Sequence, residues 1–195
     1  MSAIRGVAPH DVAGAVEAYL DDAGLAAAGR TSEDRTSDQV RIAESQGGWT
    51  TVTWPSYFAP HDLAACRWLS HELHTVVTAA TTTDDEGWSH TLFGCGTLLD
   101  RFHSYPAGLA WDDDDVAGLA REWAGDFELV ARVVGVDACG IRRHFCQAPS
   151  DARNHPGRER DGYLALWSGL GIRVADAPPY AVLAVDPAWQ RVTAR

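Results

Sequence analysis

The segment WSHTLFGCGTLLDRFHS at positions 88–104 consists of two runs that contain Thr, Trp, Phe and Leu, separated by Gly94-Cys95-Gly96. Short runs with β-branched and aromatic residues are typical of β-strands, and a short connection rich in glycine joins antiparallel strands in a hairpin. We therefore predict strands at 88–93 and 97–103. A chain with this hairpin is constrained to build an antiparallel sheet.

The length of the hairpin loop decides which residues lie opposite each other. Counting outward from a three-residue loop gives the pairs Phe93 with Thr97, Leu92 with Leu98, His90 with Asp100, and Trp88 with Phe102. His90 and Asp100 would then share one face with the Trp88–Phe102 and Leu92–Leu98 pairs. A partly desolvated imidazole beside a carboxylate is a candidate for acid–base chemistry, with a structural hydrogen bond as the alternative. A loop of two residues would shift the register and abolish this pairing.

The rest of the chain predicts an α+β fold, with an antiparallel sheet and a helix packed on one face. Strand patterns occur at 40–43, 49–54 and 75–82, and helical spacing occurs at 10–28 and 62–73. Near Trp111 the period changes to three or four residues, which predicts a mostly helical C-terminal half.

The length of 195 residues favours a single α+β domain. We expect a sheet core at about 38–106, a helical part at about 112–172 and a returning strand at 180–186.

Charge and composition exclude several classes of function. All 16 basic residues are arginine, which excludes a Walker phosphate loop and Schiff-base chemistry, because both need a lysine. A net charge of −11 opposes binding to nucleic acid or anionic lipid and suits a basic protein partner. No apolar run is long enough for a membrane span and no signal peptide is evident, so we expect a cytoplasmic protein.

Two groups of acidic residues are candidates for binding such a partner. They precede and follow the hairpin and comprise Asp84, Asp85, Glu86, Asp112, Asp113, Asp114 and Asp115. A regular hairpin would return both groups to the same end of the sheet. The structural alternative is that one group solvates a turn and the other caps a helix.

No cofactor or metal site is expected from the sequence. His71 and His74 lie three residues apart, whereas zinc-binding helices of the zincin type place their histidines four apart. The cysteines form no pair with the CxxC spacing of a zinc ribbon.

Residues 128–145 resemble a helix-turn-helix unit. Ala131, Gly135 and Ile141 have the spacing of its small residue, turn glycine and inward aliphatic residue. Arg142 and Arg143 would then meet DNA, although the same spacing occurs in any tightly packed pair of helices.

The segment GWSHTLFGCGTLLDRFHSYP, together with Gly47-Gly48-Trp49, ELVARVVGV and YLALWSGLGI, resembles a group of uncharacterised actinomycete-type bacterial proteins. In these proteins the hairpin ends in a D-x-F-x-S-x-P pattern, and the resemblance covers residues 47–185. Some members are similar in size and acidity to immunity proteins of polymorphic toxin systems. The resemblance implies no catalytic residues.

Three hypotheses follow from the sequence. An acidic, immunity-like protein without catalytic activity would bind a basic partner. A small-molecule enzyme would use a pocket around His90 and Asp100. A regulator would place Arg142 and Arg143 on DNA. The acidity and the lack of a strong catalytic motif favour the first.

Overall fold

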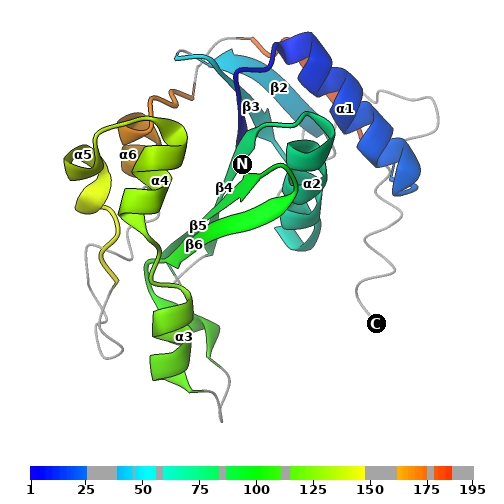
Figure 1. Ribbon diagram of the computed structural model, residues 1–195. Coiled ribbons are helices and arrows are strands. Elements are labelled where there is room, and N and C mark those ends of the chain that lie inside the picture. Colours follow the sequence, from blue (N-terminus) through cyan, green and yellow to red (C-terminus); the bar gives the residue numbers. More distant parts are fainter. Residues whose placement is uncertain are drawn as a thin grey trace.

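The computed structural model in Figure 1 describes most of the chain. The described residues are 1–25, 39–45, 47–55, 59–83, 87–110, 115–147, 162–174 and 178–185.

One seven-stranded sheet runs through the molecule in the order β6-β5-β4-β1-β3-β2-β7. Every pair of neighbouring strands is antiparallel. The strands are β1 (Ser2–Arg5), β2 (Gln39–Ser45), β3 (Trp49–Thr53), β4 (Val76–Thr83), β5 (Gly87–Gly94), β6 (Thr97–His103) and β7 (Ala181–Ala184). The antiparallel sheet predicted at 49–54, 75–82, 88–93 and 97–103 is confirmed.

The short first strand was not predicted, yet it lies between β3 and β4 near the middle of the sheet. Ser2, Ala3 and Ile4 are fully buried, and the amino group of Met1 donates a hydrogen bond to the Ala80 carbonyl at 3.0 Å. Four residues are too few to show a period. Only the partners on both sides make this segment a central strand.

Helices cover both faces of the sheet, as Figure 1 shows, and not the single face that the sequence predicted. Helices α1 (Pro9–Asp22) and α2 (Ala59–Glu72) lie on one face, and α4 (Phe127–Val134), α5 (Ala138–Arg142) and α6 (Gly162–Gly169) lie on the other. The 3-10 helix η3 (Pro106–Leu109) and α3 (Val116–Glu122) follow β6 and lie apart from both layers.

The two layers exist because the strands are apolar on both faces. In β5, Phe93 belongs to the core beneath α1 and α2, whereas Leu92 and Trp88 belong to the core beneath α4, α5 and α6. Burying both faces of a central strand requires a helical layer on each side.

The prediction of a mostly helical C-terminal half needs a correction. Helices are spread along the chain, since α1 and α2 belong to the N-terminal half. Strand β7 lies within the range expected for a returning strand and pairs with β2 at the edge of the sheet.

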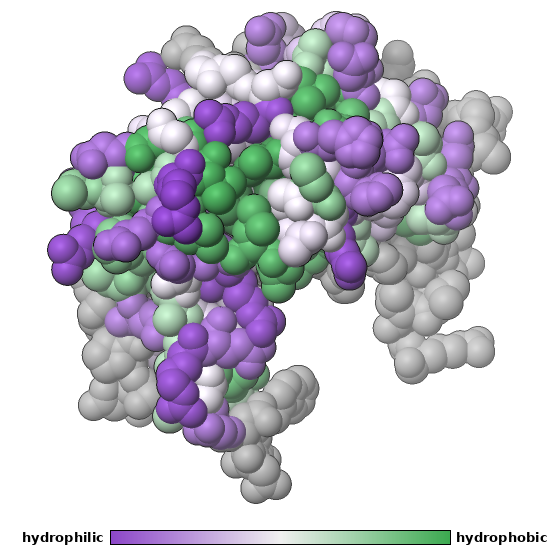
Figure 2. All heavy atoms as spheres, viewed as in Figure 1, coloured by the Kyte–Doolittle hydropathy of each residue, from purple (hydrophilic) through white to green (hydrophobic). Residues whose placement is uncertain are grey.

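The surface in Figure 2 is divided between polar helices and an apolar band. Apolar residues gather near the middle of this face, between the layer of α4 to α6 and the layer of α1 and α2, whereas polar residues dominate the outer helices. Among the helices that the structure describes, none is both long enough and apolar enough to span a bilayer.

Candidate functional site

The turn between β5 and β6 contains two residues, Cys95 and Gly96. Both have positive φ angles, 47° and 79°, as the type I′ hairpin turn requires. A β-bulge follows in β6, because Leu92 pairs with Asp100 and Phe93 with Leu98, which leaves Leu99 without an opposite residue. A Cβ added at Gly94 would lie 2.8 Å from Leu99 Cδ1, so the glycine makes room for the bulged side chain.

The predicted pairing of His90 with Asp100 is therefore wrong. His90 pairs with Phe102, and Asp100 pairs with Leu92. The short turn and the bulge together shift the register by two positions relative to a three-residue loop. An even shift keeps side chains on the same face, so His90 and Asp100 are diagonal neighbours on one face of the sheet.

His90 lies completely inside the protein. Its Nε2 is 2.6 Å from Thr78 Oγ1, and the Phe145 ring meets it edge-on with 6.2 Å between ring centroids. Burial lowers the pKa of His90 to about 4, so the imidazole is neutral at pH 7. Its Nδ1 is buried and has no hydrogen-bond partner within the described part of the chain.

Asp100 connects the hairpin to the helical layer. Its Oδ1 accepts a hydrogen bond from the Asp126 amide at 2.8 Å, just before α4 begins. Burial raises the pKa of Asp100, and the hydrogen bond from the Asp126 backbone opposes that rise. Its Oδ2 is buried and has no hydrogen-bond partner among the described residues.

This arrangement suits a structural role better than catalysis. A general acid or base must come within hydrogen-bond reach of its substrate. His90 has no exposed surface, and Asp100 is 9% exposed. Phe145 covers the imidazole in this conformation, so a substrate would have to displace it to reach His90.

Most of the acidic candidates lie outside the described residues. The candidates outside the described residues are Asp84, Asp85, Glu86, Asp112, Asp113 and Asp114. Asp115 is described and precedes α3, where its exposed carboxylate lies 3.5 Å from the guanidinium of Arg121.

The arginines proposed to meet DNA are exposed at the end of a short helix. Helix α5 has five residues, Ala138–Arg142, and Arg143 follows it. Arg142 lies over the Phe127 ring, 5.6 Å from its centroid. A recognition helix reads bases along several residues of one face, so a helix of little more than one turn offers little length for this purpose.

His71 lies in the last turn of α2, and His74 follows the end of the helix. The rings of His71 and His74 are 6.1 Å apart. Within the described ranges, no group of three or more His, Cys, Asp or Glu side chains could hold a metal ion.

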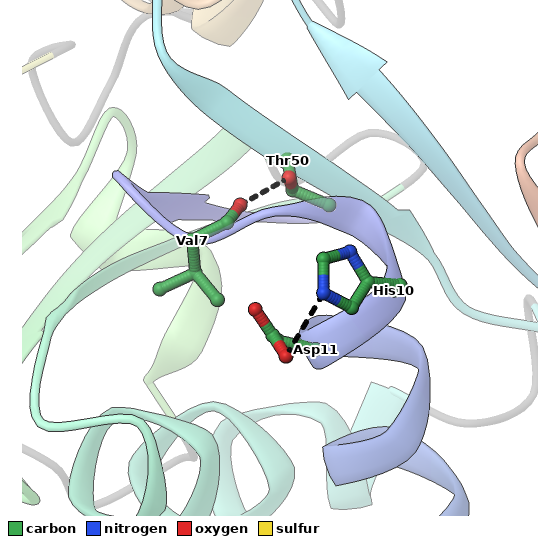
Figure 3. Close-up of polar contacts among 4 residues, drawn as sticks. All are labelled: Val7, His10, Asp11 and Thr50. Atoms are coloured by element: carbon green, nitrogen blue, oxygen red, sulfur yellow. Dashed lines mark hydrogen bonds and ion pairs between the residues drawn. The ribbon is translucent and has the colours of Figure 1, made fainter.

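A solvent-open groove of about 520 Å³ between α1 and α2, called the α1–α2 cavity below, was not predicted from the sequence. Its lining residues include Asp11, Trp68 and Glu72. Thr50 in β3 donates a 2.7 Å hydrogen bond to the Val7 carbonyl and fixes the turn that leads into α1. Figure 3 shows the Asp11 carboxylate between the Val7 side chain and the His10 imidazole, whose Nε2 is 3.3 Å from Asp11 Oδ1.

One sequence signal could have indicated this cavity. Gly14 and Ala18 lie four residues apart on α1, so two of its turns carry almost no side-chain volume on one side. Comparison of the chain with family models, with curated proteins and with solved structures finds no match.

Proposed function

We propose that this chain is a cytoplasmic, immunity-like protein that binds a basic surface of another protein and has no catalytic activity of its own. The net charge of −11 supports an electrostatic attraction to such a partner. Complementary charge accelerates association and suppresses binding to acidic proteins.

The charge distribution on α1 carries this proposal. The helix exposes Asp11, Glu17, Asp21 and Asp22 and contains no lysine or arginine. Asp21 and Asp22 occupy its last turn, where the partial negative charge of the helix dipole disfavours carboxylates. These residues therefore do not stabilise the helix, and a cation supplied by a partner would stabilise both.

The buried position of His90 also supports binding over catalysis. A neutral imidazole that bonds to Thr78 within the core contributes to the packing of two strands. Binding of a partner protein at the surface does not require access to the buried His90 imidazole.

The test is the association of the protein with the product of an adjacent gene, measured by stopped-flow kinetics between about 50 and 500 mM salt. We expect the association rate constant to fall as salt rises. The double variant Asp21→Asn/Asp22→Asn should lower that rate constant at low salt and weaken its salt dependence, because two charges leave the α1 surface.

A matched control removes two charges elsewhere. Glu44 in β2 and Glu128 in α4 are both exposed and lie on other elements. Glu44→Gln/Glu128→Gln should leave the rate constant closer to that of the unmodified protein. An association rate that responds to neither the salt nor the α1 variant would contradict the proposed function.

A further inference from the structure

The cavity between α1 and α2 has one wall of small residues and one wall of large ones. Gly14 and Ala18 line it from α1, and Trp68, Glu72 and Leu73 line it from α2 and its end. The cavity is an open groove and not an enclosed pocket, because Asp11, Gly14, Ala18 and Glu72 in its lining are all exposed.

The small residues keep this space open. A Cβ placed on Gly14 would meet no heavy atom within 4 Å. Tyr19 and Trp68 pack against each other with ring centroids 5.6 Å apart, so the two helices are in contact nearby and the cavity is a local gap between them.

Charge in the cavity has one sign. Its lining includes the carboxylates of Asp11 and Glu72 and contains no basic side chain among the described residues. In the described part of the chain, neither carboxylate pairs with an arginine, and Asp11 lies 3.3 Å from the imidazole of His10.

Trp68 adds a second preference for cations. It is half-buried, and an indole ring attracts ammonium and guanidinium groups through its quadrupole. Val7, Ala15 and Leu73 provide apolar surface for an alkyl chain. Two carboxylates, one indole and an apolar floor match an arginine or lysine side chain, which has a hydrocarbon stem and a cationic head.

We infer that the α1–α2 cavity receives an arginine or lysine side chain of the basic partner, with Asp11 and Glu72 binding the cationic head and Trp68 packing on it or on its stem. This inference rests on the proposed function and adds a location and a ligand chemistry to it. An anionic ligand is disfavoured, because both charged groups in the lining would repel it.

The first experiment uses N-acetyl-arginine amide as the probe and N-acetyl-citrulline amide as its neutral control. The tryptophan indole N–H signals are followed by NMR, and the Trp68 signal is assigned with Trp68→Phe. We expect the arginine probe to shift the Trp68 signal and the citrulline probe to leave it in place. No shift of that signal at saturating arginine probe would overturn the inference.

The second experiment fills the cavity. Gly14→Leu places a side chain into the open space and improves helix propensity, so the variant should fold. Gly14→Ala is the matched control, because it changes the same position and leaves most of the space open. We expect Gly14→Leu to abolish the Trp68 shift and to weaken partner binding by about tenfold or more, whereas Gly14→Ala retains both.

A third experiment removes the charges. Asp11→Asn/Glu72→Gln should abolish the shift with the arginine probe, and Glu17→Gln, on the same helix but outside the cavity lining, should preserve it.

The outcomes separate this inference from the proposed function. Partner binding could depend on salt and on Asp21 and Asp22 and yet be equally tight in Gly14→Leu and Gly14→Ala. That result would overturn the cavity as the binding site and would leave the proposed function standing. If the unmodified protein shows no salt-dependent association with the partner, the proposed function is contradicted. The arginine probe then still decides whether the cavity binds a guanidinium.

Discussion

Thr78 Oγ1 and His90 Nε2 are 2.6 Å apart, and this hydrogen bond links β4 to β5 beneath the layer of α4, α5 and α6. Both residues are fully buried. A buried polar atom that loses its partner costs more than the bond itself contributes. The Thr78–His90 pair therefore gives the apolar core one specific arrangement of the two strands.

Thr78→Val should destabilise the protein by about 1–3 kcal/mol, because it removes the hydroxyl while nearly conserving volume and leaves His90 Nε2 without its partner. The free energy of unfolding from urea titration at pH 7 is the measurement. Thr97→Val is the control, since Thr97 is exposed in β6 and should change stability little. Equal stabilities of both variants would show that the pair contributes nothing.

Asp100→Ala should also destabilise by about 1–3 kcal/mol, because the Asp126 amide loses its acceptor in a partly buried site. Asp100→Asn keeps an oxygen acceptor and should lose less. The free energies of unfolding of the two variants at pH 7 test this order, and a greater loss in Asp100→Asn than in Asp100→Ala would contradict it.

The hairpin shows what the sequence can and cannot predict. The glycine-rich connection and the β-branched and aromatic residues on either side of it placed both strands correctly, because these side chains favour extended backbone. The pairing failed because the turn has two residues and Leu99 forms a bulge over Gly94, and both features depend on packing across strands. The shorter turn and the bulge each shift the register by one residue, which makes two in all. His90 and Asp100 therefore lie on one face as predicted, although they are not directly opposite each other.

The stability of the protein should fall as pH decreases from 6.5 toward 4. Burial lowers the pKa of both His90 and His103 to about 4 from an ordinary value of 6.5. In this window the unfolded chain binds protons that the folded protein excludes, so acid favours unfolding. The stability contributed by the two neutral histidines is fully present above pH 6.5. By the time the pH has fallen to 4, the stability lost through His90 alone is roughly 3 kcal/mol.

Urea titrations at about pH 7.5 and about pH 4.5 measure this loss, and His90→Gln should reduce it because one of the two groups is gone. Asp100 acts in the opposite direction. Burial raises its pKa above 3.8, so its contribution is fully present below pH 3.8 and is lost as the pH rises through its folded value. If the free energy of unfolding of His90→Gln falls between the two pH values by as much as that of the unmodified protein, His90 is not the group responsible.

The central strand and the α2 wall of the cavity could not be predicted for a related reason, although Gly14 and Ala18 mark the α1 wall. Strand β1 becomes central because β3 and β4 pair with it on either side. The cavity becomes a site because Trp68 and Glu72 of α2 face the small residues of α1. Each depends on segments that lie far apart in the chain, whereas a sequence pattern reports only local periodicity.

Alanine substitutions at two glycines should change stability in opposite directions. Gly125 has a φ of 68°, and a Cβ there would lie 2.7 Å from Phe145 Cδ1 and 2.9 Å from Phe102 Cβ. Gly125→Ala combines a left-handed backbone with a clash in the core and should cost about 2–4 kcal/mol. Gly14 lies within a helix and its Cβ would meet open space, so Gly14→Ala should stabilise by about 0.5–1 kcal/mol. Urea unfolding at pH 7 measures both, and a Gly125→Ala variant as stable as the unmodified protein would mean that the segment joining α3 to α4 can move away from Phe102 and Phe145 without loss.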